Sequence, residues 1–236
     1  MKPLIVIPAH NEEGNISSLL DELAAYRDRY DVVVIDDASE DQTAQIVRER
    51  GVPLVELKAN LGIGGAMQTG FKYAASLNYD IVIQVDGDGQ HDPVWLDSLI
   101  APITGGTANC VIGSRYTSEH MEQDYEASFP RRAGMLFSTL ILLLATGKLI
   151  RDTTSGFRAL DRGAFVYFAR NYPVDHPEAE ALLMLHQAGF KIKEVPVRMR
   201  TRQAGDSSVT WLKAAQYPFR VLVGFMGLFL NSKKAA

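Results

Sequence analysis

Ile81-Val82-Ile83-Gln84-Val85-Asp86-Gly87-Asp88 is the stretch of sequence that decides the fold. Its first five residues are mostly apolar, which predicts a short strand covered on both faces, as in the middle of a parallel sheet. Similar runs come earlier at Leu4–Ile7, closed by Pro8, and at Val32–Ile35, closed by two aspartates. Strands of this kind, each ending in a polar turn, indicate an open sheet of the α/β class.

Helical patterns fill the spaces between these strands. Apolar residues recur at helical spacing from Ile16 to Leu23. Ser39–Gln42 is typical of a capping box and predicts a second helix from there to about Arg50, while Asp92-Pro93 predicts the start of another helix. Further strands are expected at 53–57, 108–112 and 191–197, and further helices after the glycines at 62–65 and at 133–150, 162–171 and 177–188. Strand and helix therefore alternate in a doubly wound α/β pattern.

Composition limits the function classes. The 236 residues, 47% of them apolar, fit one large domain, and a net charge of -4 gives no reason to expect a nucleic-acid partner. Cys110, the single cysteine, cannot form an internal disulfide, and the early first strand leaves no room for a signal peptide. We therefore expect the protein to be cytoplasmic.

Two apolar segments qualify that expectation. The stretches 133–150 and 221–230 are both shorter than the roughly 20 apolar residues that span a bilayer, so each suits a buried helix or a helix in the membrane interface. We accordingly divide the chain into a catalytic domain, residues 1–208, and a C-terminal helical segment, residues 209–236. The polar loop at 117–128 is long enough to act as a lid.

The chemistry is expected at the carboxyl ends of the strands, where open α/β sheets bind their ligands. Carboxylates follow three predicted strands, at Glu12, at Asp36-Asp37, and at Asp86 and Asp88. Gathering them at one edge is unfavourable unless a cation or a donor-rich ligand lies there. Asp86 and Asp88 offer hard oxygens suited to Mg²⁺ or Mn²⁺ bridging a diphosphate, and Gln90 could add a neutral oxygen. A solvated acidic turn is the alternative interpretation of this motif.

The glycine-rich stretch Asn60–Gly65 resembles a dinucleotide fingerprint but fails as one. Met67 stands where the third glycine belongs, so a hydride-transfer enzyme is not expected. The glycines either let the backbone approach a nucleotide or form a tight turn, and the sequence leaves both open.

Eight motifs between Ile5 and about Tyr217 carry a resemblance to a known family. In chain order they read IPAHNEEGNI, VIDDASEDQT, NLGIGGAMQTG, DGDGQHDP, GSR, DTTSGFRAL, EVPV and MRTRQAGDSS. Together they resemble the family-two inverting glycosyltransferases of the GT-A type, close to dolichol-phosphate mannosyltransferases and bacterial polyprenyl-phosphate glycosyltransferases. The resemblance implies a Rossmann-like, mostly parallel sheet flanked by helices.

It also implies roles for individual residues. The nucleoside would be held by Pro8, His10, Glu12, Ile35 and Asp37. The donor diphosphate and its metal would be held by Asp86, Gly87, Asp88, Gln90 and Arg202. The acceptor phosphate would be held by Arg115, Arg131 and Ser155. Asp88, Asp152, Glu180 and Arg202 are the expected catalytic residues. Asp152 either orients the nucleophile, acts as a base or caps the following turn, and Glu180 supports the site.

The acceptor fits this pattern physically. A lipid phosphate monoester has a second pKa near 6, so its oxygen is already anionic at neutral pH and hardly needs a base. Its charge does need arginines, and the candidates are Arg115, Arg131, Arg158, Arg200 and Arg202. The sequence thus predicts metal-dependent, inverting transfer of a sugar from a UDP- or GDP-sugar to dolichyl or undecaprenyl phosphate.

Two alternatives stay open. A glycosyltransferase acting on a saccharide hydroxyl would need a strong general base, and an inactive module would bind nucleotide sugar or lipid without turnover. The expected partners are the nucleotide sugar, polyprenyl phosphate, the membrane surface near Arg220, Lys233 and Lys234, and, for a homo-oligomer, a second copy of the chain. The predicted location is peripheral, on the cytoplasmic face of the membrane. The sequence names neither the sugar nor the base.

Overall fold

A computed structural model describes residues 1–117, 129–173 and 177–201. For residues 129–135, 137, 177 and 178 it describes the backbone alone. The loop predicted at 117–128, apart from Thr117, and the C-terminal segment predicted at 209–236 lie outside the described residues.

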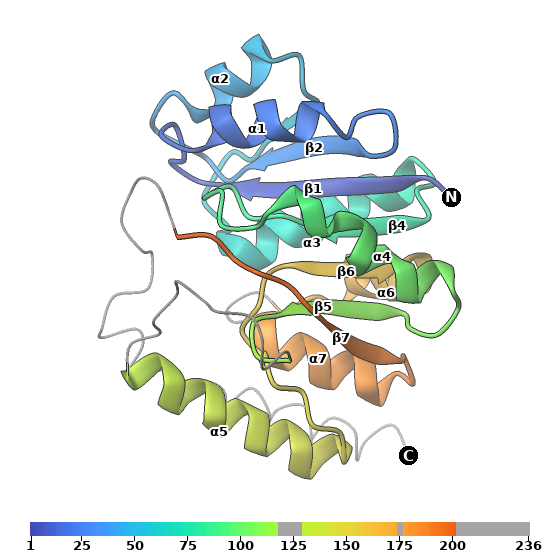
Figure 1. Ribbon diagram of the computed structural model, residues 1–236. Helices are drawn as coiled ribbons and strands as arrows, with labels where there is room; N and C mark the ends of the chain where they lie inside the picture. The colour runs from blue at the N-terminus through green and yellow to red at the C-terminus, as the bar shows by residue number, and fades with distance from the viewer. Residues whose placement is uncertain (118–128, 174–176, 202–236) are drawn as a thin grey trace.

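The described chain forms a seven-stranded sheet in the order β3-β2-β1-β4-β6-β5-β7 (Figure 1). Its strands are β1 Pro3–Ala9, β2 Asp31–Asp36, β3 Leu54–Glu56, β4 Ile81–Gln84, β5 Cys110–Ser114, β6 Arg158–Asp161 and β7 Ile192–Pro196. β6 runs antiparallel to β4 and β5, while the other pairs are parallel. The predicted α/β class with a mostly parallel sheet is confirmed, and the strand that ends in the acidic turn lies at its centre.

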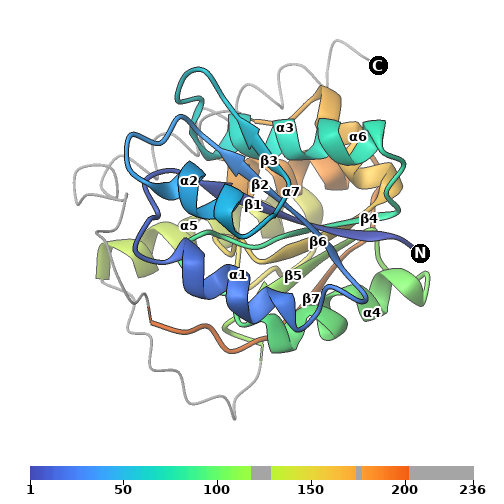
Figure 2. The same cartoon turned by 90° about the horizontal axis from the view of Figure 1, so that it is seen from above.

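Helices cover both faces of the sheet (Figure 2). One apolar core lies under α1 Ile16–Ala24, α2 Thr43–Glu49 and α4 Leu96–Thr104, and a second lies under α3 Gly62–Ser76, α5 Phe129–Thr146, α6 Arg162–Arg170 and α7 Pro177–Gln187. Alternate residues of β1 divide between the two, since Ile5 and Ile7 face one core while Leu4 and Val6 face the other. The strands are apolar throughout because both of their faces are buried.

Gly70 lets α3 lie close against the sheet. A Cβ added at this glycine would lie 2.3 Å from Cγ1 of Val6, far inside van der Waals contact. Val6 is a fully buried, β-branched residue of β1 with little freedom to move. The close approach of helix and strand therefore depends on the missing side chain.

Three segments compare differently with what the sequence predicts. The helix after Asp92-Pro93 is confirmed, with a short 3-10 turn, η1 Pro93–Trp95, leading into α4 and the Asp92 carboxylate accepting from the Val94 amide. The predicted capping box at 39–42 is wrong, because α2 begins at Thr43 and the Asp41 carboxylate accepts from the Thr43 amide instead. β6 is not among the strands predicted from the sequence, and it forms because its backbone pairs with β4 and β5 on either side.

The long helix predicted at 133–150 is α5, shifted to Phe129–Thr146. Leu142 is buried against the core, and Ser138 Oγ lies 2.8 Å from Thr153 Oγ1. Leu136, Leu140 and Leu144 are more than half exposed, at 66%, 53% and 78%, and lie at helical spacing along one side. α5 therefore presents an apolar stripe outward. Within the residues that the structure describes, no helix combines the length and apolar character needed to cross a membrane.

Candidate functional site

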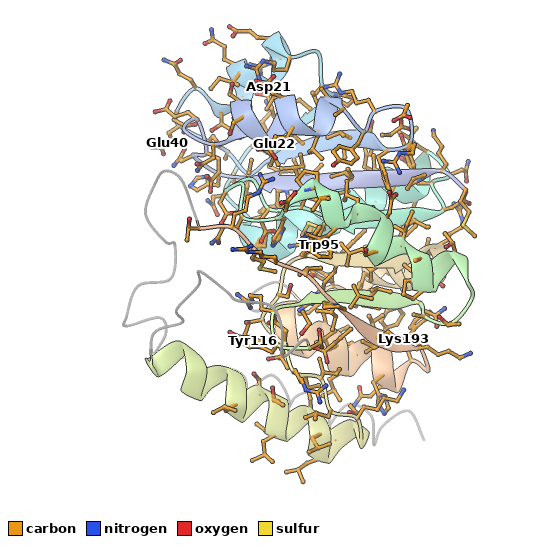
Figure 3. The ribbon with its side chains drawn as sticks, viewed as in Figure 1. Asp21, Glu22, Glu40, Trp95, Tyr116 and Lys193 are labelled. Carbon is orange, nitrogen blue, oxygen red and sulfur yellow. The ribbon has the colours of Figure 1, made fainter. Side chains whose placement is uncertain are left out.

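Polar loops gather at the edge of the sheet where β1, β2, β4 and β5 end. β6 runs the opposite way, so its first residue, Arg158, and the loop before it lie at the same edge. Glu40, beyond β2, and Tyr116, beyond β5, mark two places along this edge in Figure 3, whereas Lys193 of β7 lies toward the other side. The predicted meeting of the strand-end motifs is thus observed.

The loops after β1 and β2 are joined by hydrogen bonds. Asp37 donates its amide to the Ala9 carbonyl at 2.8 Å, and His10 Nδ1 lies 2.9 Å from the Asp37 carbonyl. The Asp37 carboxylate accepts from the Leu61 amide at 2.7 Å, so the glycine-rich stretch is fixed to the same place. Pro8 and Ile35 are register partners across the two strands. The residues predicted to hold the nucleoside therefore form one connected region.

Two residues of these loops, Asn11 and Ala38, have left-handed backbones, with φ of 55° and 56°. For alanine this conformation is unfavourable by about 1–2 kcal/mol. The Ser39 hydroxyl accepts from the Asn11 amide at 2.9 Å, and the Asn11 side-chain oxygen accepts from the Glu40 amide at 2.8 Å. These bonds hold the two loops together and stabilise the strained turn.

The loop Asp86–Gly87–Asp88 lies directly against the β1 loop. A Cβ added at Gly87 would be 3.2 Å from the Pro8 carbonyl oxygen and 3.4 Å from Cγ of Glu12. Glycine therefore permits the close packing of the acidic loop on the predicted nucleoside region. The Glu12 carboxylate also accepts from the Asn15 side-chain amide at 2.8 Å.

Asp86 is held from several sides. Gln84 Nε2 donates to Asp86 Oδ1 at 2.9 Å, and the Asp86 amide donates to His91 Nδ1 at 3.0 Å. Because Nδ1 accepts, the proton of a neutral His91 ring is on Nε2, which lies 3.6 Å from Asp86 Oδ2. The Asp86 side chain remains 33% exposed, so its carboxylate is still accessible to a ligand.

Asp88 and Gln90 follow in the same loop. The Asp88 carboxylate accepts from the Gln90 amide at 3.1 Å, and Gln90 Nε2 donates to the Arg200 carbonyl at 3.2 Å. With its nitrogen committed, the Gln90 side chain presents its oxygen as the group that can act as a ligand. The Arg200 guanidinium binds Glu22 and Asp92, at 2.6 and 2.9 Å. Arg200 thus links the segment after β7 to the acidic loop, and its positive charge is paired with Glu22 and Asp92.

The oxygens of Asp86, Asp88 and Gln90 are ligands of the kind that suit a hard divalent cation. Among the described residues, no three His, Cys, Asp or Glu side chains come together as a ready metal cage. Mg²⁺ typically takes only one or two protein carboxylates and completes its coordination with water and substrate phosphates. Two carboxylates and one amide oxygen, with Asp86 held by hydrogen bonds from its neighbours, match that pattern.

Arg115, directly after β5, and Asp152, in the segment before β6, form a buried ion pair. Arg115 Nε and Nη2 donate to the two Asp152 oxygens at 2.8 and 2.7 Å, and the Arg115 amide adds a third bond at 3.0 Å. Asp152 is fully buried and the Arg115 side chain is 4% exposed. Burial alone would raise the pKa of the Asp152 carboxyl, but the hydrogen bonds and charge of Arg115, with the charge of Arg158, hold that pKa below its ordinary value.

For the other residues predicted to serve the acceptor, the structure describes fewer side-chain contacts. Ser155 is buried and donates its hydroxyl to the Gly113 carbonyl at 2.7 Å. Arg131 is in the first turns of α5, where the described part is the backbone. Glu180 is half-buried on α7. Arg202 lies outside the described residues.

Residues 4–168 match the family model described as glycosyl transferase family 2. This match covers more than half of the chain. The chain belongs to glycosyl transferase family 2. Membership makes the protein a glycosyltransferase, and the resemblance stated from its motifs is confirmed.

Relatives of this glycosyltransferase carry informative names. It is 29% identical over 214 residues to the UDP-N-acetylglucosamine–dolichyl-phosphate N-acetylglucosaminyltransferase of Methanococcus voltae, covering 82% of this chain and 84% of the relative. It is also 29% identical to the undecaprenyl-phosphate mannosyltransferase of Micrococcus luteus, covering 89% and 88%.

A solved structure shares its fold. Glucosyl-3-phosphoglycerate synthase from Mycobacterium tuberculosis, determined with Mn²⁺, UDP and glucosyl-3-phosphoglycerate, superposes with a TM-score of 0.74 at 20% identity, covering 96% of this chain and 79% of that one. At this identity the likeness establishes the fold alone.

Sequence reasoning missed several residues of the glycosyltransferase site. Gln84 was treated as part of an apolar strand, although a lone amide in a run buried on both faces signals a specific partner. The sequence prediction assigns no role to His91 or Gly156. Glu194, whose carboxylate accepts from the Arg151 and Asp152 amides at 2.9 Å, had no recognisable signal because its partners are about 40 residues away.

Proposed function

We propose that this glycosyltransferase transfers one sugar from a UDP- or GDP-sugar to a polyprenyl phosphate, with inversion at the anomeric carbon. An oxygen of the acceptor phosphate attacks the anomeric carbon, the bond from that carbon to the donor diphosphate breaks, and the nucleoside diphosphate leaves. The observation that carries the proposal is the meeting, at one sheet edge, of the acidic loop 86–90 with the arginine-bearing loops 113–115 and 152–158.

The donor side rests on the acidic loop. Asp86, Asp88 and Gln90 would hold Mg²⁺ or Mn²⁺ together with the donor diphosphate. A bound divalent cation would neutralise the charge that develops on the leaving diphosphate. Pro8, His10, Glu12, Ile35 and Asp37 would surround the nucleoside, and their hydrogen-bonded loops support that assignment. Arg202 would contact the diphosphate.

The acceptor side rests on the loop after Asp152. The names of the Methanococcus and Micrococcus relatives support a polyprenyl phosphate. Arg131 and Arg115 would offset the charge of the phosphate, and Ser155 would shape its site from the buried loop. The contact between Ser138 and Thr153 supports this arrangement, since it joins α5, which carries Arg131, to that loop.

Asp152 would act by orienting Arg115 rather than as a base. Both of its oxygens are engaged by a buried cation, and a carboxylate with a lowered pKa is a poor proton acceptor. Transfer to a saccharide hydroxyl would require a base, so this pairing favours the phosphate acceptor over the alternative. Glu180 would support the acceptor site from α7.

The membrane surface would be reached through α5. Its exposed leucines suit an amphipathic helix lying in the interface. This makes the protein peripheral to the membrane, and the cytoplasmic face remains a prediction from the sequence. Flotation with liposomes tests it: no association with neutral or anionic vesicles would contradict the interfacial role.

The decisive experiment incubates purified protein with a panel of nucleotide sugars, with and without polyprenyl phosphate, and with and without EDTA. Formation of glycosylated lipid that needs both the lipid and the metal is expected. Sugar transfer that proceeds without lipid, or that chelation leaves unchanged, would refute the proposal. Arg131→Ala should weaken use of the acceptor while donor binding is retained, so equal losses of both would contradict its role.

A further inference from the structure

The loop that precedes β6 packs against the Asp86 carboxylate. A Cβ added at Gly156 would lie 2.6 Å from Asp86 Oδ2, 3.1 Å from Oδ1 and 3.0 Å from Gln84 Nε2. Gly156 has no need of a left-handed backbone, since its φ is outside that region. Its lack of a side chain is therefore required by the neighbouring carboxylate and amide and not by the turn.

The next residue extends the same contact. Phe157 stacks on the His91 ring, with centroids 4.7 Å apart and an interplanar angle of 10°. The Phe157 carbonyl accepts from the Gly113 amide at 2.8 Å, and the Ser155 hydroxyl donates to the Gly113 carbonyl. Residues 155–157 are thus fixed to β5 on one side and to the Asp86–His91 loop on the other.

Gln84 and His91 complete the surroundings of Asp86. Gln84 is 6% exposed and His91 is 3% exposed, so the polar atoms of both are turned inward. Gln84 binds one carboxylate oxygen, and His91 Nδ1 accepts from the Asp86 amide while its Nε2 faces the second oxygen. A carboxylate with one bound oxygen and one flanked oxygen has a restricted orientation.

We propose that Gln84, His91 and Gly156 are positioning residues that hold the Asp86 carboxylate in the orientation in which it binds the divalent cation. The proposal rests on the proposed function, since it assumes that Asp86 is a metal ligand. It goes further by making the loop before β6, expected to serve the acceptor, part of the metal site.

Gly156→Ala is the sharpest test, because folding and metal binding should respond differently. The atoms that an added methyl group would meet are the ends of two flexible side chains, which can turn away at little cost to the fold. If the Asp86 side chain turns away, its carboxylate loses the orientation in which we propose that it binds the cation. We expect an unfolding temperature close to that of the wild type, with Mn²⁺ affinity weakened roughly 10- to 100-fold, as for other residues that position metal ligands.

The measurement is titration of Mn²⁺ into the protein in the presence of UDP and, separately, of GDP, following the EPR signal of unbound Mn²⁺. This reads metal binding without requiring turnover. Gly189→Ala is the matched control, because Gly189 has a left-handed backbone, with φ of 83°, in the turn before β7 at the opposite edge of the sheet from the site. That variant should lose thermal stability and keep its Mn²⁺ affinity.

Two further substitutions separate packing from polar contact. Gln84→Met keeps the volume without the amide, and His91→Phe keeps the stack on Phe157 without the ring nitrogens. Both should weaken Mn²⁺ binding, whereas His91→Asn, whose oxygen can take the position of Nδ1, should recover part of the loss.

Two results would overturn the inference in distinguishable ways. If the wild type binds Mn²⁺ with a nucleoside diphosphate and Gly156→Ala and Gln84→Met bind it within twofold of the wild type, Asp86 is not positioned by these residues, while the metal site stands. If the wild type binds no Mn²⁺ with either nucleotide, the metal site of the proposed function fails and this inference fails with it.

Discussion

Replacing Asp152 by asparagine should strongly destabilise the protein. The substitution keeps the size of the side chain but removes its charge and places an NH₂ group opposite the donors of Arg115. The buried Arg115 cation would lose the charge of Asp152, while its hydrogen bond to the Thr154 hydroxyl at 2.9 Å is kept. Breaking a buried pair from one side costs about 3–5 kcal/mol. For a chain of this size, that lowers the unfolding temperature by roughly 6–20 °C.

Urea unfolding followed by circular dichroism measures this free energy directly. The exposed pair of Arg48 and Glu56 provides the matched control, since its side chains are 55% and 43% exposed. Glu56→Gln should cost no more than about 1 kcal/mol.

A double-mutant cycle tests the pairing itself. Combining Arg115→Met with Asp152→Asn removes the buried cation together with its partner, so the double variant should be less destabilised than the sum of the single variants, by on the order of 2 kcal/mol. An Asp152→Asn cost below about 1 kcal/mol, or strict additivity, would refute the buried ion pair as described.

Other expectations concern activity, strain, the membrane and pH. Asp88→Ala should lower sugar transfer by roughly 100-fold or more with an unchanged circular dichroism spectrum, and near-normal turnover would remove it from the metal site. Ala38→Gly should raise the free energy of unfolding by up to about 1 kcal/mol, because glycine relieves the left-handed backbone; a measured loss in urea would contradict the strain. Glutamates at Leu140 and Leu144 should abolish flotation with liposomes at unchanged stability, and unchanged flotation would exclude α5 as the contact. Because the folded pKa of Asp152 is depressed, its stabilising contribution is present above its ordinary pKa of about 4 and is lost as pH falls through the depressed value. The urea midpoints of the wild type and Asp152→Asn should therefore converge as pH falls below about 4.

Much of this fold could be predicted from the sequence because its strands are short, apolar and closed by polar turns. The runs at 4–7, 32–35 and 81–85 have this pattern, and they form the adjacent strands β1, β2 and β4. The acidic loop 86–90 could be placed at the site edge for the same reason, since it follows the central strand.

β6 could not be predicted, because nothing local marks it as a strand. Its four residues Arg158–Asp161 begin and end with charge and show no alternation. The Arg158 side chain is nevertheless buried, and its Nη2 donates to the Thr153 carbonyl. That environment exists only once β4 and β5 have assembled on either side, so the strand is decided by tertiary pairing.

The partners of the site residues escaped prediction for a related reason. Asp152 could be read as a base or a cap because its partner, Arg115, is 37 residues away in the sequence. Nothing in the sequence around Gly156 marks it as special, because the carboxylate it accommodates, Asp86, lies in the loop after another strand. Sequence spacing identified which groups could do chemistry, while contacts between distant segments determine which of them are available.

The antiparallel strand β6 limits which changes in loop length this glycosyltransferase can tolerate. Its amino end joins the loop that packs against the Asp86 carboxylate, and the strand itself is paired with β4 and β5 in a set register. Lengthening or shortening residues 155–158 would shift Gly156 and Phe157 relative to the acidic loop 86–90 and disturb it. If the proposed function holds, exchanges of acceptor loops between relatives should therefore preserve the length of this segment and vary its surroundings.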